Sequence, residues 1–304
     1  MSESYYNRRI VKVAAIINPI SGAGADGHAA ERRAAMVREA LDRRGLRGQI
    51  DVTTSAGHAH LLARRAADDQ ADLVIVWGGD GTVNEAGAAL LYTSTALGLV
   101  PAGSGNGLAA SLCCPRDPRA AITAALDGKT RAIDAGFLDR RPFFNIAGIG
   151  VDARVARLFN LRGPGARGLW PYVLLGLREA YRYAAIDYEV ELDGTRTPVR
   201  ALLIAFANGR EYGNGMTLCA DAQLDDGLLD ATIIEDRPVV SRLLHARHLA
   251  RGAAERAPRV VTRKIRRAVV RAPVEMEYHV DGEPGSADGV IEVEIRPGAL
   301  KVRG

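Results

Sequence analysis

The chain has 304 residues, of which 47% are hydrophobic and 25% are charged, and its formal net charge is +4. These values are close to the globular average, so they exclude collagen, coiled coils and a largely disordered chain. The length suggests two domains. The small charge, 5% aromatic residues and no recognition motif argue against a nucleic-acid binder.

The first third of the chain alternates apolar runs with amphipathic segments. The pattern predicts strands at 11–17, 49–54, 73–77 and 96–100, and helices at 27–44, 59–67 and 83–91. In the first helix, Val37 and Leu41 belong to the predicted buried side and Arg33 does not. Buried strands separated by helices imply a parallel sheet of βαβ units.

After residue 134 the pattern becomes rich in short strands. Strands are predicted at 143–149, 187–192, 200–208, 228–234, 259–265, 268–271, 274–280 and 290–295, with helices at 170–183 and 239–252. Closely spaced strands with Asp-Gly turns indicate an antiparallel sandwich or barrel. We therefore predict an α/β domain over 1–132 and a β domain over 133–304, with residues 296–304 packing back on the first.

Three glycine-rich turns follow predicted strands of the first domain, at 18–24, 78–85 and 101–108. Ligands of open α/β sheets bind at the carboxyl ends of the strands. Glycines let the backbone approach an anion, and N–H groups at a helix start bind phosphate. Thr82 and Ser104 add hydroxyl donors. A Walker A lysine and a G-x-G-x-x-G motif are both missing, which argues against P-loop and Rossmann proteins.

Asp80 lies within the second turn. A carboxylate among phosphate-binding glycines repels the ligand unless it holds a cation or takes a proton. Both roles suit phosphoryl transfer, in which positioning and charge neutralisation by magnesium dominate. The alternative is an aspartate that caps the following helix.

Two acidic turns occur in the second half. Residues 221–230 carry four aspartates, and such oxygen ligands suit magnesium or calcium, although a solvated turn explains them equally well. The segment 281–284, with the sequence Asp-Gly-Glu-Pro, has the composition of a hairpin turn.

Taken together, these motifs resemble the diacylglycerol kinase catalytic-domain family, which includes bacterial lipid kinases and sphingosine and ceramide kinases. The resemblance implies a nucleotide domain (NAD kinase-like), a C-terminal β-sandwich and an active site in the cleft between them. It implies ATP contacts at Asn18, Ser21, Thr53, Gly78, Gly79, Asp80, Gly81, Thr82, Val83, Asn84 and Ser104. It maps a metal loop onto Asp226 with carbonyls of Gln223 and Leu228, and a proton acceptor onto Glu283, with Asp80 as the alternative.

Two positions depart from the family pattern. Gly107 stands where bacterial members often carry an acid after the third turn. Arg154 stands near the place where the sphingosine kinase branch uses an acid to meet the lipid amine. A cation there disfavours an amine substrate. The lipid class therefore stays open.

These observations predict an ATP- and Mg²⁺-dependent lipid kinase, a phosphotransferase that acts on an alcohol group such as that of diacylglycerol. The alternatives are a kinase of NAD or another small metabolite, and a non-catalytic lipid- or nucleotide-binding module.

No secretory signal is evident and the three cysteines suit a reducing compartment as buried small residues, so a cytoplasmic location is expected. An apolar segment at 170–177 and basic residues over 259–271 suggest a peripheral encounter with an anionic membrane. The oligomeric state, a homodimer included, stays open.

Overall fold

The computed structural model describes residues 12–22, 25–161, 175–176, 178–179, 181–213, 216–217, 219–236 and 260–304. It divides into two compact units, Met1–Ile133 with Gly298–Gly304, and Asp134–Pro297. The predicted helix at 239–252 lies outside the described residues, as does half of the one at 170–183.

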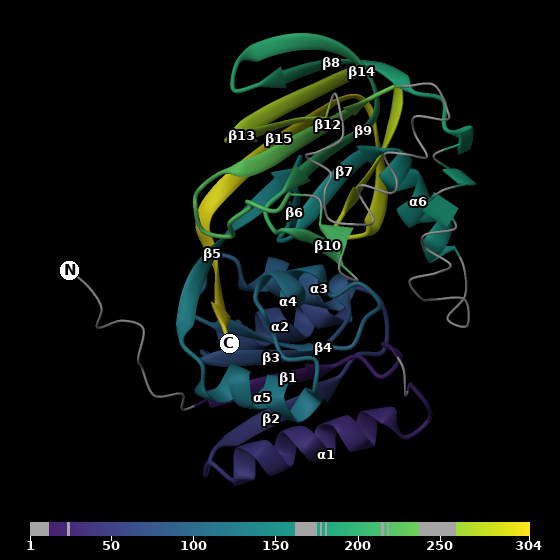
Figure 1. Ribbon diagram of the computed structural model, residues 1–304. Coiled ribbons are helices and arrows are strands. Elements are labelled where there is room, and N and C mark those ends of the chain that lie inside the picture. Colours follow the sequence, from purple (N-terminus) through teal and green to yellow (C-terminus); the bar gives the residue numbers. More distant parts are fainter. Residues whose placement is uncertain are drawn as a thin grey trace, which may run out of the picture. The chain divides into compact units, whose positions relative to one another are not determined.

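The first unit is built on a parallel sheet in the order β4-β3-β1-β2. Its strands are β1 (Lys12–Ile17), β2 (Arg47–Val52), β3 (Leu73–Gly78) and β4 (Ala96–Pro101), and its helices are α1 (Ala29–Asp42), α2 (His58–Asp68), α3 (Asp80–Leu90), α4 (Gly107–Ser111) and α5 (Pro118–Asp127). Helices α1 and α5 cover one face and α2 and α3 the other (Figure 1). Every residue of β3 is buried, as expected for a strand covered on both faces.

The helices of this unit differ from the prediction in two respects. Helix α3 begins at Asp80, so this residue belongs to the helix itself. Helices α4 and α5 were not predicted, although Asp117 caps α5 by accepting from the Ala120 N–H at 2.8 Å, followed by proline in the first turn. The end of the chain returns to this unit, where Val302 pairs in parallel with Leu97 of β4.

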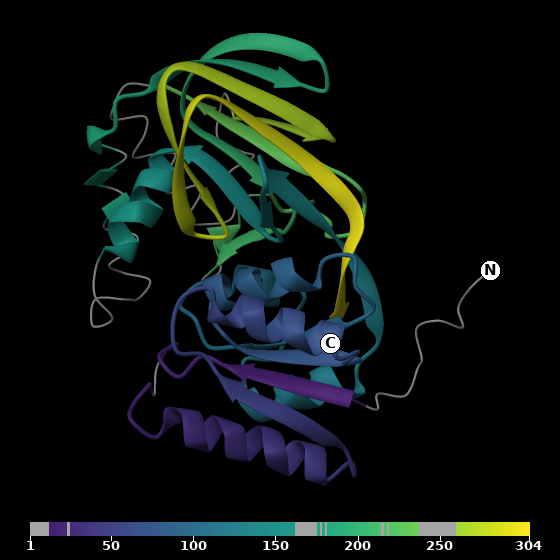
Figure 2. The same cartoon turned by 180° about the vertical axis from the view of Figure 1, so that it is seen from behind.

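The second unit is an antiparallel β-sandwich. Its elements are β5 (Thr130–Leu138), β6 (Arg141–Phe143), β7 (Ile146–Gly150), α6 (Val151–Asn160), β8 (Ile186–Leu192), β9 (Thr195–Ala207), β10 (Glu211–Gly213), β11 (Met216–Thr217), β12 (Leu229–Glu235), β13 (Val260–Ile265), β14 (Arg267–Val280) and β15 (Glu283–Arg303), of which β5 begins and β15 ends in the first unit. The long strands β9 and β14 each pair with β8 along one half and with β7 along the other. This pairing encloses an apolar core. Figure 2 shows β14 and β15 side by side in yellow tones.

Several predicted strands are modified. The strand predicted at 143–149 is interrupted after Phe143. The next two backbone N–H groups donate to the Asp281 carboxylate and not to a neighbouring strand. The strands at 268–271 and 274–280 form one strand, β14, with an irregularity between Arg271 and Glu275. Helix α6 was not predicted. Of the three cysteines that were expected to be buried, only Cys219 is; Cys114 is half-buried, and Cys113 is exposed because it lies in the turn after α4.

The apolar, uncharged stretch at 86–115 does not form a membrane span. Proline and glycine interrupt it, and it contributes to α3, β4 and α4 of the first unit. Within the described ranges, none of the helices combines the length and the apolar character that crossing a bilayer requires.

Candidate active site

The first glycine-rich turn follows β1 and is tied to the second turn by Asn18. The side-chain amide of Asn18 donates to Thr82 Oγ1 at 2.8 Å, and its Oδ1 accepts from the Ile20 N–H at 3.1 Å. The Asn18 backbone N–H donates to the Trp77 carbonyl at 2.9 Å. Since Thr82 lies in the first turn of α3, one side chain joins the end of β1 to the start of that helix.

The three turns approach one another so closely that two positions have no room for a Cβ atom. Gly22 has a φ of +73°, and a Cβ there would lie 1.8 Å from the Ala102 carbonyl oxygen. A Cβ on Gly103 would lie 2.7 Å from the Gly79 Cα. Glycine is therefore required for the contacts of the third turn with both other turns. The resulting backbone arrangement suits the binding of one anion by several N–H groups.

Asp80 holds the third turn in place. Its Oδ2 accepts from the Asn106 N–H and its Oδ1 from the Gly107 N–H, both at 2.8 Å. These N–H groups belong to the start of α4, not of α3. The Asn106 side chain closes the same turn by accepting from the Gly103 N–H at 2.8 Å. The sequence predicted a metal ligand, a base or a cap for the following helix, and the structure shows a carboxylate that caps a different helix.

The other predicted nucleotide-binding residues of this unit lie at the same edge of the sheet. Thr53 follows β2, and its N–H donates to the Ile17 carbonyl at 2.9 Å. Gly78 ends β3, where a Cβ would lie 2.6 Å from that of Thr82. Ser104 is exposed in the third turn, and Ser21 is buried in the first. Residues Gly81, Val83 and Asn84 lie in α3, after the second turn.

Sequence reasoning missed Arg33, which supports the first turn from α1. Its guanidinium is buried and donates to the carbonyls of Asn18 at 2.5 Å and Ser21 at 2.7 Å. It also lies over the Trp77 ring, 5.5 Å from the centroid. Burial lowers the pKa of Arg33. The available signal was its spacing, since Arg33 precedes the buried Val37 by one helical turn.

In the second unit, Glu283 begins β15 directly after a two-residue hairpin turn. Asp281 and Gly282 have φ values of +48° and +86°, which are typical of a type I′ turn. The Asp281 carboxylate accepts hydrogen bonds from three consecutive backbone N–H groups where β6 leads into β7. The donors are Phe144, Asn145 and Ile146, at 2.9–3.0 Å. The hairpin turn that precedes Glu283 is therefore fixed to the connection between β6 and β7.

The acidic loop around Asp226 already contains a cation. Lys264 Nζ lies 2.8 Å from Asp226 Oδ2 and 3.1 Å from Asp230 Oδ2, while Asp226 Oδ1 accepts from the Leu228 N–H at 3.0 Å. Burial lowers the pKa of Lys264, but the hydrogen bonds to the two carboxylates outweigh this and raise it. Burial also raises the pKa of Asp230.

At the metal site that the resemblance implies at Gln223, Asp226 and Leu228, the Asp226 side chain already has other partners. Both oxygens of Asp226 have hydrogen-bond partners, and one of these is an ammonium group. In the described parts of the chain, no three His, Cys, Asp or Glu side chains are grouped to hold a metal. We expect the charge of Lys264 to serve this loop in place of a metal ion.

Metal removal tests this assignment. We expect EDTA to leave the midpoint of thermal unfolding of the nucleotide-free protein unchanged. We expect Lys264→Met to lower the unfolding free energy by about 1 kcal/mol, because it leaves the buried Asp230 carboxylate without its partner. The measurement is calorimetry with and without EDTA, with Lys129→Met, an exposed lysine, as the control. A wild-type protein that EDTA destabilises would contradict the assignment.

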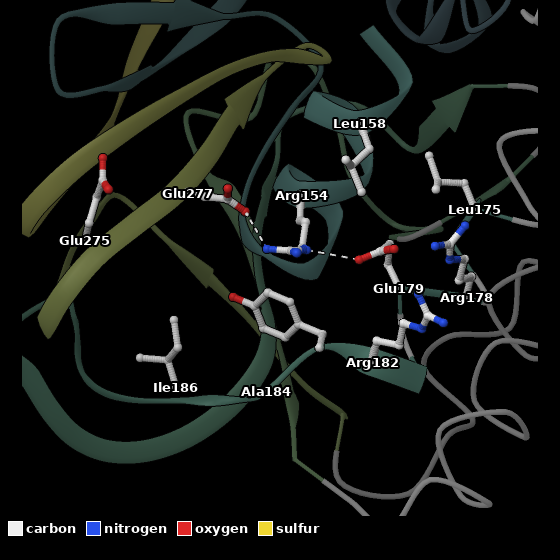
Figure 3. A pocket seen from close by; sticks show the side chains of 11 residues that line it. Arg154, Leu158, Leu175, Arg178, Glu179, Arg182, Ala184, Ile186, Glu275 and Glu277 are labelled. Atoms are coloured by element: carbon white, nitrogen blue, oxygen red, sulfur yellow. Dashed lines mark hydrogen bonds and ion pairs between the residues drawn. The ribbon is translucent and has the colours of Figure 1, made fainter. Parts of the chain in front are cut away.

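A cavity of about 720 Å³ opens in the second unit between α6, the helical segment around Glu179 and β14 (Figure 3). Its apolar lining comes from Leu158, Leu175 and Ile186, and its charged lining includes Arg178, Arg182 and Glu275. The cavity therefore offers both apolar surface and charged groups to a ligand.

Arg154 does not present the uncompensated charge that the sequence suggested. Its guanidinium lies 3.0 Å from Glu179 and 4.0 Å from Glu277, so it joins two walls of this cavity (Figure 3). Arg157 adds a further ion pair to Glu277 at 2.6 Å. The paired charge weakens the expectation that a cation at Arg154 disfavours an amine substrate.

Two family models match nearly the whole chain. The diacylglycerol kinase catalytic domain matches residues 12–138, and the YegS C-terminal NAD kinase beta sandwich-like domain matches residues 145–304. The chain belongs to the diacylglycerol kinase catalytic-domain family. The predicted family and fold class are thereby confirmed. Members of this family transfer a phosphoryl group to a hydroxyl group, so the protein is a phosphotransferase of the lipid kinase family.

Relatives match along most of their length. A diacylglycerol kinase of Mycobacterium tuberculosis is 32% identical over 303 residues, which cover 96% of this chain and 95% of the relative. A probable YegS-like lipid kinase of Cronobacter sakazakii is 32% identical over 260 residues, covering 84% and 85%. The crystal structure of a diacylglycerol kinase from Bacillus anthracis has a TM-score of 0.72 at 19% identity and covers 97% of each chain. At this identity the structural likeness shows the shared fold.

Proposed function

We propose that the protein transfers the γ-phosphoryl group of ATP, in the presence of Mg²⁺, to the hydroxyl group of a diacylglycerol-like lipid. The observation that carries this proposal is the convergence of three glycine-rich turns at one edge of the parallel sheet. Phosphoryl transfer depends mostly on positioning and on stabilisation of charge. A rigid set of backbone N–H groups meets the first of these needs.

In this proposal the triphosphate lies along the three turns. The start of α3 offers backbone N–H groups and a positive helix end, and the exposed Ser104 hydroxyl adds a donor. Asn18 and Arg33 hold the first turn in its binding conformation. Thr53 extends the same edge at the end of β2.

We propose that Mg²⁺ enters with the nucleotide. Magnesium commonly keeps several waters and binds through substrate phosphates and only one or two carboxylates. The Asp80 oxygens accept N–H groups and the Asp226 oxygens face Lys264 and a backbone N–H, so neither side chain is free for a dedicated metal site. The metal ion neutralises phosphate charge when it is bound.

Glu283 is the proton acceptor that the geometry favours over Asp80. The Asp80 carboxylate is committed to two backbone N–H groups of α4. Glu283 follows a clamped hairpin turn, where a carboxylate is presented from a rigid support. Its role is to take the proton of the lipid hydroxyl as the oxygen attacks phosphorus.

The cavity in the second unit suits the lipid. Leu158, Leu175 and Ile186 provide surface for acyl carbon atoms, and the charged residues suit a polar head group. A peripheral encounter with the membrane is part of this proposal. The attraction of the basic strand residues to anionic lipid is reduced, because Lys264, Arg267 and Arg271 have carboxylate partners.

The test is incubation with γ-labelled ATP and a panel of acceptors in detergent micelles. The panel contains diacylglycerol, monoacylglycerol, sphingosine, phosphatidylglycerol and, in solution, NAD. We expect Mg²⁺-dependent label in the diacylglycerol product, with its mass increased by one phosphoryl group. Label in phosphorylated NAD, with none in any lipid, would contradict the proposal. Chelation of Mg²⁺ should abolish transfer.

A further inference from the structure

A histidine and an aspartate form a buried pair below the hairpin turn that carries Glu283. His279 is 4% exposed and Asp152 is 9% exposed. His279 Nε2 lies 3.1 Å from Asp152 Oδ2, although the two residues are 127 positions apart in the sequence. Nothing in the proposed chemistry uses either side chain directly.

The hydrogen bonds of the ring define which nitrogen carries the proton. The backbone N–H of Gly282 donates to His279 Nδ1 at 3.3 Å. Nδ1 is therefore the acceptor, and Nε2–H donates to the Asp152 carboxylate. Asp152 thus fixes the tautomer in which His279 can hold the Gly282 peptide.

The surrounding backbone makes room for this pair. A Cβ on Gly148 would lie 1.8 Å from Asp152 Oδ2 and 2.8 Å from His279 Nε2, so only glycine fits in β7 at this point. The Ala153 N–H donates to Asp152 Oδ1 at 2.8 Å. Both Asp152 oxygens are therefore engaged, one by the ring and one by the backbone.

We propose that His279 and Asp152 are positioning residues for Glu283. The hydrogen bonds that run from Asp152 through His279 to Gly282 end one residue before Glu283. Glu283 pairs with Val280 across the turn. Asn160 of α6 holds the next peptide group, between Gly282 and Glu283, by donating to the Gly282 carbonyl at 3.2 Å. The proposal rests on the proposed function, because it assigns a purpose to the orientation of the Glu283 carboxylate.

Two substitutions of His279 separate its two hydrogen bonds. The amide oxygen of His279→Asn lies where Nδ1 was, so it still accepts from the Gly282 N–H but no longer reaches Asp152. The amide of His279→Gln extends to the place of Nε2, so it still donates to Asp152 but leaves the Gly282 N–H without its acceptor. A role as core filling alone predicts the same kinetic effect from both variants.

We expect His279→Gln to lower kcat by at least about tenfold, since small misplacements of a catalytic group have effects of this size or larger. The KM for ATP should stay unchanged, because the nucleotide turns belong to the other unit. His279→Asn should keep kcat within about threefold of wild type by the same reasoning, while unfolding at a lower temperature. Asp152→Ala keeps Nδ1 beside the Gly282 N–H but no longer fixes the tautomer, so it should lower kcat by less than His279→Gln does. Equal kcat values for the Gln and Asn variants would overturn the proposal.

Hydrogen exchange gives a readout that needs no activity. We expect the peptide containing residues 280–284 to exchange faster in His279→Gln than in wild type, and at the wild-type rate in His279→Asn. The Asp193-Gly194 turn, which has positive φ values at both residues as well, is the internal control and should not change. A wild type that phosphorylates no lipid would refute the proposed function. Unchanged exchange in His279→Gln would refute the positioning role.

Discussion

Glu283→Gln is expected to lower kcat for lipid phosphorylation by about 10²–10⁴-fold, which is the usual contribution of general acid–base catalysis. The glutamine side chain keeps the size of glutamate but cannot take the proton of the lipid hydroxyl. The hairpin itself should be unaffected, because its clamps are the Asp281 carboxylate and the His279 ring. The measurement is steady-state kinetics with saturating lipid, together with calorimetric titration of ATP, whose affinity should be unchanged.

Glu292→Gln is the matched control, because it changes a carboxylate on the same strand β15. Its exposed ion pair with Arg267 contributes little to stability. We expect wild-type kcat from this variant. A Glu283→Gln protein with wild-type kcat would show that another group takes the proton, and Asp80 would again become the candidate.

Asp80→Ala is expected to weaken ATP binding by roughly 100-fold, a loss of about 2.7 kcal/mol. Each hydrogen bond to a charged group contributes about 1.5–3 kcal/mol, and the Asp80 carboxylate makes two such bonds to the start of α4. Without them the third turn loses its conformation next to Gly79 and Gly22. Asp80→Asn should restore little of the ATP affinity, because its NH₂ group would face a backbone N–H and could not accept from it. Titration of ATP into each variant measures the effect.

Asp117→Ala is the control for the loss of a capping aspartate in the same unit. Its side chain accepts one N–H at the start of α5, so its removal should cost about 1 kcal/mol of stability without changing ATP affinity. The substitution of Asp80 distinguishes its two possible roles, because loss of a helix cap lowers the ATP affinity whereas loss of a base lowers kcat. An Asp80→Ala protein with normal ATP affinity and a reduced kcat would favour a base over the scaffold that the structure shows.

The sequence could predict features whose cause lies within a few neighbouring residues. The buried run 73–77 followed by two glycines specifies a strand that leads into a turn, and the structure has β3 and α3 there. The Asp-Gly pairs at 193 and 281 specify tight hairpins, and both have positive φ values. The ordered motifs were sufficient for the family. Helix boundaries were less certain, since Asp80 begins α3 instead of preceding it.

The partner of each charged side chain was decided by the tertiary structure. Asp80 meets backbone groups 26 and 27 positions away, Lys264 meets Asp226 at a separation of 38, and His279 meets Asp152 at a separation of 127. Local periodicity carries no information about such distant encounters, because packing of whole strands and helices brings these groups together. Composition and local pattern thus determined the alternation of elements, the turns and the family. Only the folded chain determined that Asp80 accepts from the start of α4, that Lys264 lies beside Asp226 and Asp230, and that His279 and Asp152 form a buried pair.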